Sequence, residues 1–158
     1  VNKSFVQPTA AGRYGLHELL RQYTIGRLDD APPGRKAELH ERHCAYYSAA
    51  LERWAADLKG ARQREAMEEI DQEIDNARAA WLWAVDRGQI GRAAHGIDGL
   101  ALYYTWRVRY DEGEAALRAA AHKLEAAAGE DAGARRLWAR ALALWGSFLI
   151  EQGQKAGA

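Results

Sequence analysis

IDGLALYY (residues 97–104) and LALWGSFL (residues 142–149) decide how this sequence folds. Each stretch begins with a large apolar residue. A second follows three residues later, then directly a small residue, and after three more positions a third large residue. This is helical spacing. The small residue lets a second helix approach closely, and its large neighbours fill the groove between the helices. The recurrence of the pattern 45 residues later predicts stacked helical units.

Tetratricopeptide repeats carry this arrangement, W-x2-L-G-x2-Y, in the first of their two helices. The first stretch is followed, at the offsets of a second repeat helix, by Tyr110, Gly113, Leu117 and Ala120. Because the usual repeat has about 34 residues, the longer offset is interpreted as an extension of the turn at GEDAG (129–133). Gly153 is expected at the turn after the second stretch. Gly96 and Gly99, in mid-helix, are interpreted as sites of close helix packing.

Helical periodicity extends over most of the chain. Helices are predicted from about residue 16 to 28, 35 to 59, 66 to 86, 90 to 106, 111 to 127 and 132 to 152. Before them, SFVQ and RYGL read as a short hairpin. The predicted fold is all-α: an antiparallel helical array that becomes a tetratricopeptide-like solenoid, with an N-terminal β-hairpin. The predicted parts are 1–30, a winged-helix remnant; 35–88, a helical linker; and 89–158, the repeats.

Composition excludes several classes of protein. A hydrophobic content of 48% with 3 prolines is typical of a folded domain. The single cysteine, Cys44, rules out an intramolecular disulfide and fits a reducing cytoplasm. No run approaches the roughly 20 apolar residues that span a bilayer, so no membrane association is predicted. Val1 opens the chain in a strand-like pattern without a methionine, and we expect a fragment of a longer protein.

Three blocks of the sequence resemble the STAND regulators, the signal-transduction ATPases with numerous domains. RYGLHELLRQYTIGRL (13–28) resembles the end of their winged-helix domain. RHCAYY (42–47) and EIDNARAAWLWAVDRG (73–88) resemble the helical segment that joins the winged helix to the repeats. The resemblance implies a nucleotide-binding domain before the winged helix, a sensor made of repeats after it, and contacts between this chain and those neighbouring domains.

The resemblance also gives His17 a role. Leu16-His17-Glu18 aligns with the Met-His-Asp motif of the family, in which Leu16 and Glu18 replace the outer residues. In that family the histidine approaches the phosphate of bound ADP. This sequence contains no GxxxxGK[ST] loop, so we expect the chain alone to hold no cofactor and His17 to act only with the nucleotide domain. ADP or ATP would belong to the intact protein.

The repeats are the predicted sensor. By resemblance they would bind a protein or small-molecule effector and so shift the nucleotide-dependent switch. The first helix of each tetratricopeptide pair lines the concave surface, which selects the following partner-binding candidates: His95, Asp98, Leu102, Thr105, Trp106, Arg140, Ser147 and Glu151. The last helix is expected to leave an apolar face through which the chain self-associates.

A nucleic-acid contact module is the main alternative. RVRY (107–110) and GARR (133–136) place arginines near aromatic residues, and STAND regulators are often transcriptional activators. Lysine plus arginine (22) nevertheless equal aspartate plus glutamate (22). Phosphate binding relies on a basic excess, so direct nucleic-acid binding is not the favoured reading.

An independent helical enzyme is the weaker alternative. No serine has a neighbouring base, and the carboxylates of EIDNAR (73–78) suit hydrogen bonds between helices better than catalysis. HERHC (40–44) offers two histidines and Cys44 at helical spacing. A zinc site needs three or four ligands, usually with a second element. We therefore predict neither catalysis nor a metal site.

Overall fold

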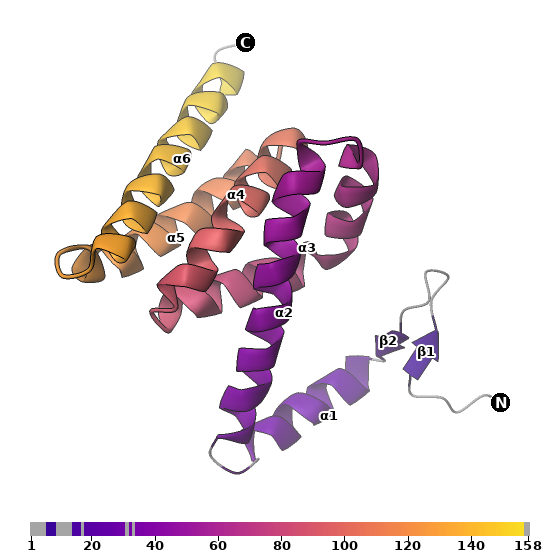
Figure 1. Ribbon diagram of the computed structural model, residues 1–158. Helices are drawn as coiled ribbons and strands as arrows, with labels where there is room; N and C mark the ends of the chain where they lie inside the picture. The colour runs from indigo at the N-terminus through magenta and orange to yellow at the C-terminus, as the bar shows by residue number, and fades with distance from the viewer. Residues whose placement is uncertain (1–5, 9–13, 17, 31, 33, 157–158) are drawn as a thin grey trace. The chain divides into compact units, whose positions relative to one another are not determined.

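The computed structural model describes residues 6–8, 14–16, 18–30, 32 and 34–156 (Figure 1). In chain order, the elements are β1 Val6–Pro8, β2 Tyr14–Leu16, α1 Glu18–Asp29, α2 Arg35–Leu58, α3 Gln63–Asp86, α4 Ile90–Trp106, α5 Tyr110–Ala128 and α6 Ala132–Ala156. The prediction of an all-α array is confirmed, and α4 begins and ends where the sequence placed it. Contacts divide the chain into two units, residues 1–40 and 41–158.

The first unit contains the two strands and α1. β1 pairs antiparallel with β2, with Val6 opposite Leu16 and Pro8 opposite Tyr14. Residues 9–13, which would form the turn, and His17 lie outside the described residues. The winged-helix origin of this segment and the role of His17 therefore stay predictions.

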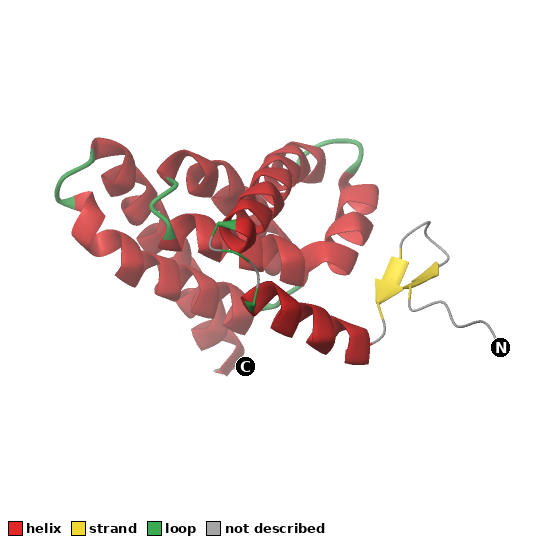
Figure 2. Cartoon of the chain, turned by 90° about the horizontal axis from the view of Figure 1, so that it is seen from below, coloured by secondary structure: helices red, strands yellow, loops and turns green. Residues whose placement is uncertain are grey.

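The second unit is a two-layer array of helices. Short loops join consecutive helices, which run antiparallel (Figure 2). Besides these chain neighbours, α4 contacts α6 and α3 contacts α5. The backbone of α2 at Leu51 also lies directly against Gly99 of α4. One layer therefore contains α2, α4 and α6, and the other contains α3 and α5.

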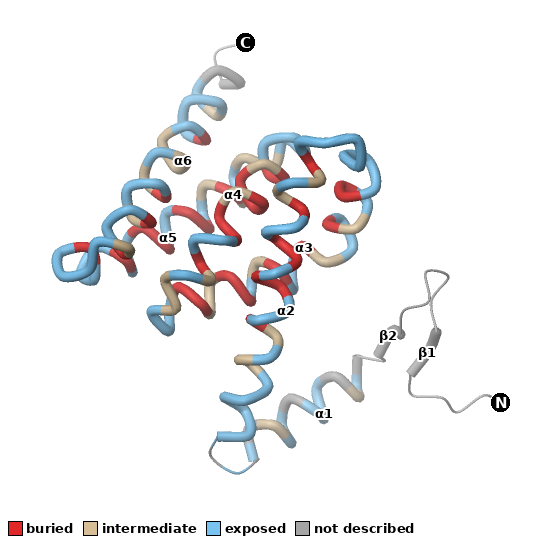
Figure 3. Tube along the Cα trace, in the orientation of Figure 1, coloured by how far each residue is buried: buried red, intermediate tan, exposed pale blue. Residues whose placement is uncertain are grey.

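The core of this unit lies between the two layers. Figure 3 shows the buried positions gathered on the sides of the helices that face one another. Trp81 is almost fully buried, and its indole N–H donates to the carbonyl of Ala93, 2.8 Å away. A Cβ on Gly96 would lie 2.8 Å from the Trp81 ring, and one on Gly99 would lie 2.5 Å from the Leu51 carbonyl oxygen. The prediction that these glycines permit close helix packing is confirmed. In the described part of the chain, no helix is both long and apolar enough to cross a bilayer.

The last helix differs from its predicted length. α6 continues to Ala156, so Gly153 lies inside the helix rather than at a turn. In α4 the corresponding turn comes at Val108, and α5 then packs back against α4. Among the described residues no helix packs back on α6 in that way, and backbone hydrogen bonding alone is then free to extend it.

Two turns of the array share one geometry. In the α3–α4 turn Gly88 has φ +65°, and in the α4–α5 turn Val108 has φ +58°. In both turns the amide of this residue donates to the carbonyl three positions earlier, and the next amide donates to the carbonyl five positions earlier. Glycine adopts positive φ freely, whereas a β-branched residue there is strained by about 1–2 kcal/mol.

Substitutions at these two positions with positive φ should change the free energy of unfolding in opposite directions. Gly88→Val should lower the free energy of unfolding by about 1–2 kcal/mol, because it introduces the strain that Val108 already carries. Val108→Asn should raise it by up to about 1 kcal/mol, since asparagine tolerates the left-handed region. Urea unfolding followed by circular dichroism measures both. Equal effects of the two substitutions would contradict this account of the turns.

Candidate functional site

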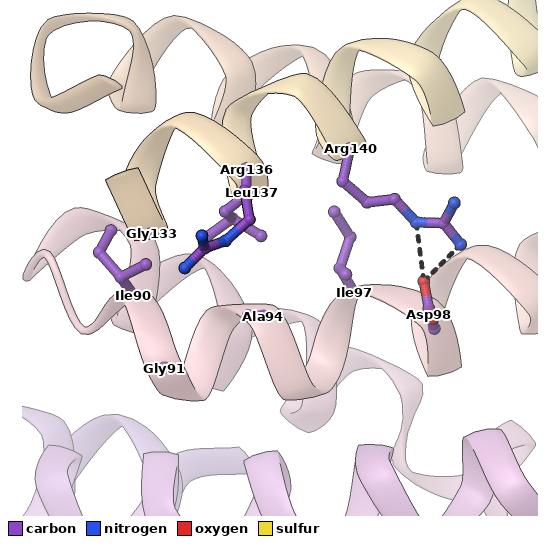
Figure 4. Close-up of a pocket in the computed structure, with 9 residues that line it drawn as sticks. All are labelled: Ile90, Gly91, Ala94, Ile97, Asp98, Gly133, Arg136, Leu137 and Arg140. Carbon is purple, nitrogen blue, oxygen red and sulfur yellow. Dashed lines mark hydrogen bonds and ion pairs between the residues drawn. The ribbon is translucent and has the colours of Figure 1, made fainter. Parts of the chain in front are cut away.

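A groove lies between α4 and α6. It has a volume of about 420 Å³. Because the helices alternate in direction, α4 and α6 run parallel and their N-terminal ends lie at the same end of the groove. Residues at helical spacing line it from both sides: Ile90, Gly91, Ala94, Ile97 and Asp98 from α4, and Gly133, Arg136, Leu137 and Arg140 from α6 (Figure 4).

Small residues create the space in this groove. A Cβ on Gly91 would meet no atom within 4 Å. Ala94 adds only a methyl group to the same side of α4. Ile97 and Leu137, both nearly fully buried, provide an apolar floor. The groove can therefore hold an apolar side chain or a short extended segment.

The polar groups of the groove are Asp98 of α4 and two arginines one helical turn apart on α6. Arg140 donates from Nε (3.1 Å) and from a terminal nitrogen (2.9 Å) to Asp98 Oδ1 of α4. Arg136 extends from α6 towards α4 (Figure 4). It makes no hydrogen bond or ion pair with another described residue, and it is exposed. The groove thus offers one uncompensated guanidinium beside a second that is already held by a carboxylate.

The neighbouring Arg135 has a different function. Its Nε donates to the carbonyl of Ala128, 2.9 Å away, and so caps the C-terminal end of α5. Asp131 caps the start of α6, where it accepts a hydrogen bond from the Ala134 amide. These contacts fix the α5–α6 turn and leave Arg136 as the arginine of GARR that lines the groove.

The structure separates the eight predicted partner-binding residues. Of these only Asp98 and Arg140 line the α4–α6 groove. His95 faces α2, where Nδ1 lies 3.3 Å from a carboxylate oxygen of Glu52. Trp106 lines a separate cavity of about 380 Å³ beside the start of α3. The other four lie elsewhere on the layer: Leu102, Thr105, Ser147 and Glu151.

Two of these four have local contacts. The Thr105 hydroxyl donates to the Ala101 carbonyl, and the Ser147 hydroxyl donates to the Leu144 carbonyl. The prediction had treated one helix face as a single surface, but packing against α2 on one side and α6 on the other divides it. Arg136 is not among the residues predicted from the sequence to line a binding surface, although its spacing of four residues from Arg140 places both on one face of a helix.

The arginines of RVRY are held by carboxylates. Arg107 pairs with Asp71 of α3 through two nitrogens. Arg109 donates to both oxygens of Glu112, 2.6 Å from each, and these hydrogen bonds hold the pKa of that carboxyl below its usual value. Arg109 also donates to the hydroxyl of Tyr103. The charge is balanced locally, which counts against RVRY as a phosphate-binding patch.

Comparison with known proteins finds similarity to part of three longer proteins. Over 101 residues, 64% of its length, the chain is 32% identical to proteins named as helix-turn-helix (HTH-type) transcriptional regulators from Mycobacterium tuberculosis and Mycobacterium bovis. The matched segment is 11% of each regulator, so the chain is similar to a small part of much longer proteins. No family model matches the sequence, and no solved structure matches it.

Proposed function

We propose that this chain is the helical-repeat sensor segment of a STAND-type transcriptional regulator. In this proposal it binds a carboxylate-bearing protein segment in the α4–α6 groove. The uncompensated guanidinium of Arg136 above an apolar floor is the observation that supports this ligand class most directly. A carboxylate accepts charge-assisted hydrogen bonds from guanidinium nitrogens, and an adjacent apolar side chain would fill the space left by Gly91 and Ala94.

The similarity to HTH-type regulators supports the transcriptional context. In this reading α4 and α5 form one tetratricopeptide-like unit and α6 begins the next. A ligand that bridges α4 and α6 would favour one spacing of the units over another. Such a difference is what a switch outside this chain would read, with ADP or ATP held by the nucleotide domain and His17 close to it. We assign no catalytic step to this chain.

The ligand class can be tested by titrating the isotope-labelled chain with acidic peptides followed by NMR. Peptides with a leucine next to a glutamate should shift the amide signals of Gly91 and Gly133 and the Nε–H signals of Arg136 and Arg140. Matched peptides with glutamine should shift them much less. Arg136→Glu should weaken binding by about 10-fold or more, because a hydrogen bond to a charged group contributes roughly 1.5–3 kcal/mol.

Arg118→Glu is the matched control. Arg118 is an exposed arginine of α5 that pairs with Glu114 and lies outside the groove. Its reversal changes the net charge as much as Arg136→Glu does, but binding should stay close to that of the unchanged chain. The proposed ligand class is wrong if both reversals weaken binding equally, or if glutamine peptides bind as well as glutamate peptides.

A further inference from the structure

α6 carries two apolar faces. The described residues cover the first face, but they cover the second only at its start, where Leu142 packs partly buried against the core. The buried face packs onto α4 and α5 and contains Ala134, Leu137, Ala141 and Phe148. The second face follows the helical spacing i, i+4, i+7, i+8, i+11 and contains Leu142, Gly146, Leu149, Ile150 and Gly153. Leu149 and Ile150 are 48% and 62% exposed, and a Cβ on Gly146 or Gly153 would meet nothing within 4 Å.

The sequence repeat gives an internal reference for this face. With the 45-residue offset, Phe148 of α6 corresponds to Tyr103 of α4, and both are buried (2% and 1% exposed). Leu149 corresponds to Tyr104, which is 1% exposed, whereas Leu149 is 48% exposed. The positions that face the preceding helices are therefore buried in both repeats. The position one residue later is buried in α4 alone.

α5 contributes to the burial of Tyr104 in α4. Its Gly113 lies so close to Tyr104 that an added Cβ would come within 3.0 Å of the Tyr104 Cβ. Ala101, which corresponds to Gly146, is likewise buried in α4. The face of α5 that packs in the array is rich in small residues with two leucines: Gly113, Ala116, Leu117, Ala120, Ala121 and Leu124. A helix of this composition approaches its neighbour closely and covers apolar side chains on either side of the contact.

We propose that the second face of α6, defined by Leu142, Gly146, Leu149, Ile150 and Gly153, is a docking site for one amphipathic helix of the α5 kind. The docked helix has glycine or alanine where it crosses Gly146 and leucines on either side. It lies against α6 as α5 lies against α4. This surface is separate from the α4–α6 groove, and the proposal is independent of the ligand proposed there.

The flank of α5 extends the site. Trp145 of α6 donates its indole N–H to Glu114 Oε1, 2.9 Å away, and its ring lies against His122. Arg118 pairs with the same Glu114 oxygen at 3.3 Å. α5 is joined to α3 by ion pairs, Arg78 to Glu112 and Lys123 to Asp86. A helix docked on α6 lies beside the Glu114–Arg118 pair, which offers it charged groups of both signs.

The test supplies such a helix within the chain. A copy of residues 107–128 is added after Ala158, and hydrogen exchange of the amides of residues 146–153 is measured by NMR. In the extended chain these amides should exchange about tenfold more slowly than in the unextended chain, because the docked helix resists local opening. The matched control is the same extension with Leu117→Ser and Leu124→Ser in the copy, which should give no slowing. Leu149→Glu in the body of the chain should abolish it.

Each outcome decides the question. Unchanged exchange in the extended chain, or equal slowing with the serine control, overturns the proposal. A second copy of the chain is the competing occupant, and sedimentation tests it. Suppose that the unextended chain forms a dimer that Leu149→Glu dissociates. If the added helix then neither dissociates this dimer nor slows exchange, the second face of α6 is a surface for self-association and the proposal is wrong. If the extension dissociates such a dimer and slows exchange, the docked helix is supported.

Discussion

Gly99→Ala is expected to lower the free energy of unfolding of the helical array by about 2 kcal/mol. The added Cβ would lie 2.5 Å from the carbonyl oxygen of Leu51 and 3.2 Å from its carbon. These are backbone atoms of α2, so no rotamer change relieves the contact and the two helices must move apart. Overpacking of this kind costs about 1–3 kcal/mol, and the higher helix propensity of alanine offsets up to about 1 kcal/mol of it.

Gly91→Ala separates the two contributions. Gly91 lies in the same helix, but a Cβ there would meet nothing within 4 Å. It should therefore gain the helix propensity alone and raise the free energy of unfolding by up to about 1 kcal/mol. Urea unfolding of both variants measures the difference, which should be roughly 3 kcal/mol. If Gly99→Ala were as stable as Gly91→Ala, the close approach of α2 and α4 would be wrong.

The helices could be predicted because their signals are local. Apolar spacing and turn residues were sufficient for α4, and the interpretation of Gly96 and Gly99 followed from the cost of glycine in mid-helix. The end of α6 was missed because its signal was not local. The analogy with the first repeat predicts a turn at Gly153, whereas α6 continues through this residue, and no described helix packs back on α6 there.

The candidate site was predictable only in part. The resemblance to tetratricopeptide repeats predicts Asp98 and Arg140 on one binding surface, and the structure brings these two side chains together across α4 and α6. His95 and Trp106 share the helix with Asp98 but contact other neighbours. Which neighbour a residue contacts depends on how α4 crosses α2 and α6, and one helix's periodicity does not contain that information. The sequence likewise does not separate Arg136, which lines the groove, from Arg135, which caps the end of α5.

Phe148→Ala is expected to have the largest effect on stability and on the groove together. The Phe148 side chain is 2% exposed, and its ring lies against Gly113, where an added Cβ would come within 2.7 Å of it. Its ring centroid is 6.0 Å from that of Tyr110. Truncation of a buried phenylalanine costs about 3–5 kcal/mol through lost burial and the cavity left behind. Because Phe148 anchors α6 to α5, the loss should fall first on α6.

Leu149→Ala, one residue later, is the matched control. Leu149 is 48% exposed, so its truncation should cost less than about 1 kcal/mol. Chemical denaturation compares the two variants, and hydrogen exchange locates the change. In Phe148→Ala the amides of α6 should exchange faster than those of α3. Peptide binding in the α4–α6 groove should weaken as well, because Arg136 and Arg140 depend on the position of α6. A Phe148→Ala variant that kept both its stability and its binding would show that α6 is held in another way, and that the groove does not depend on this contact.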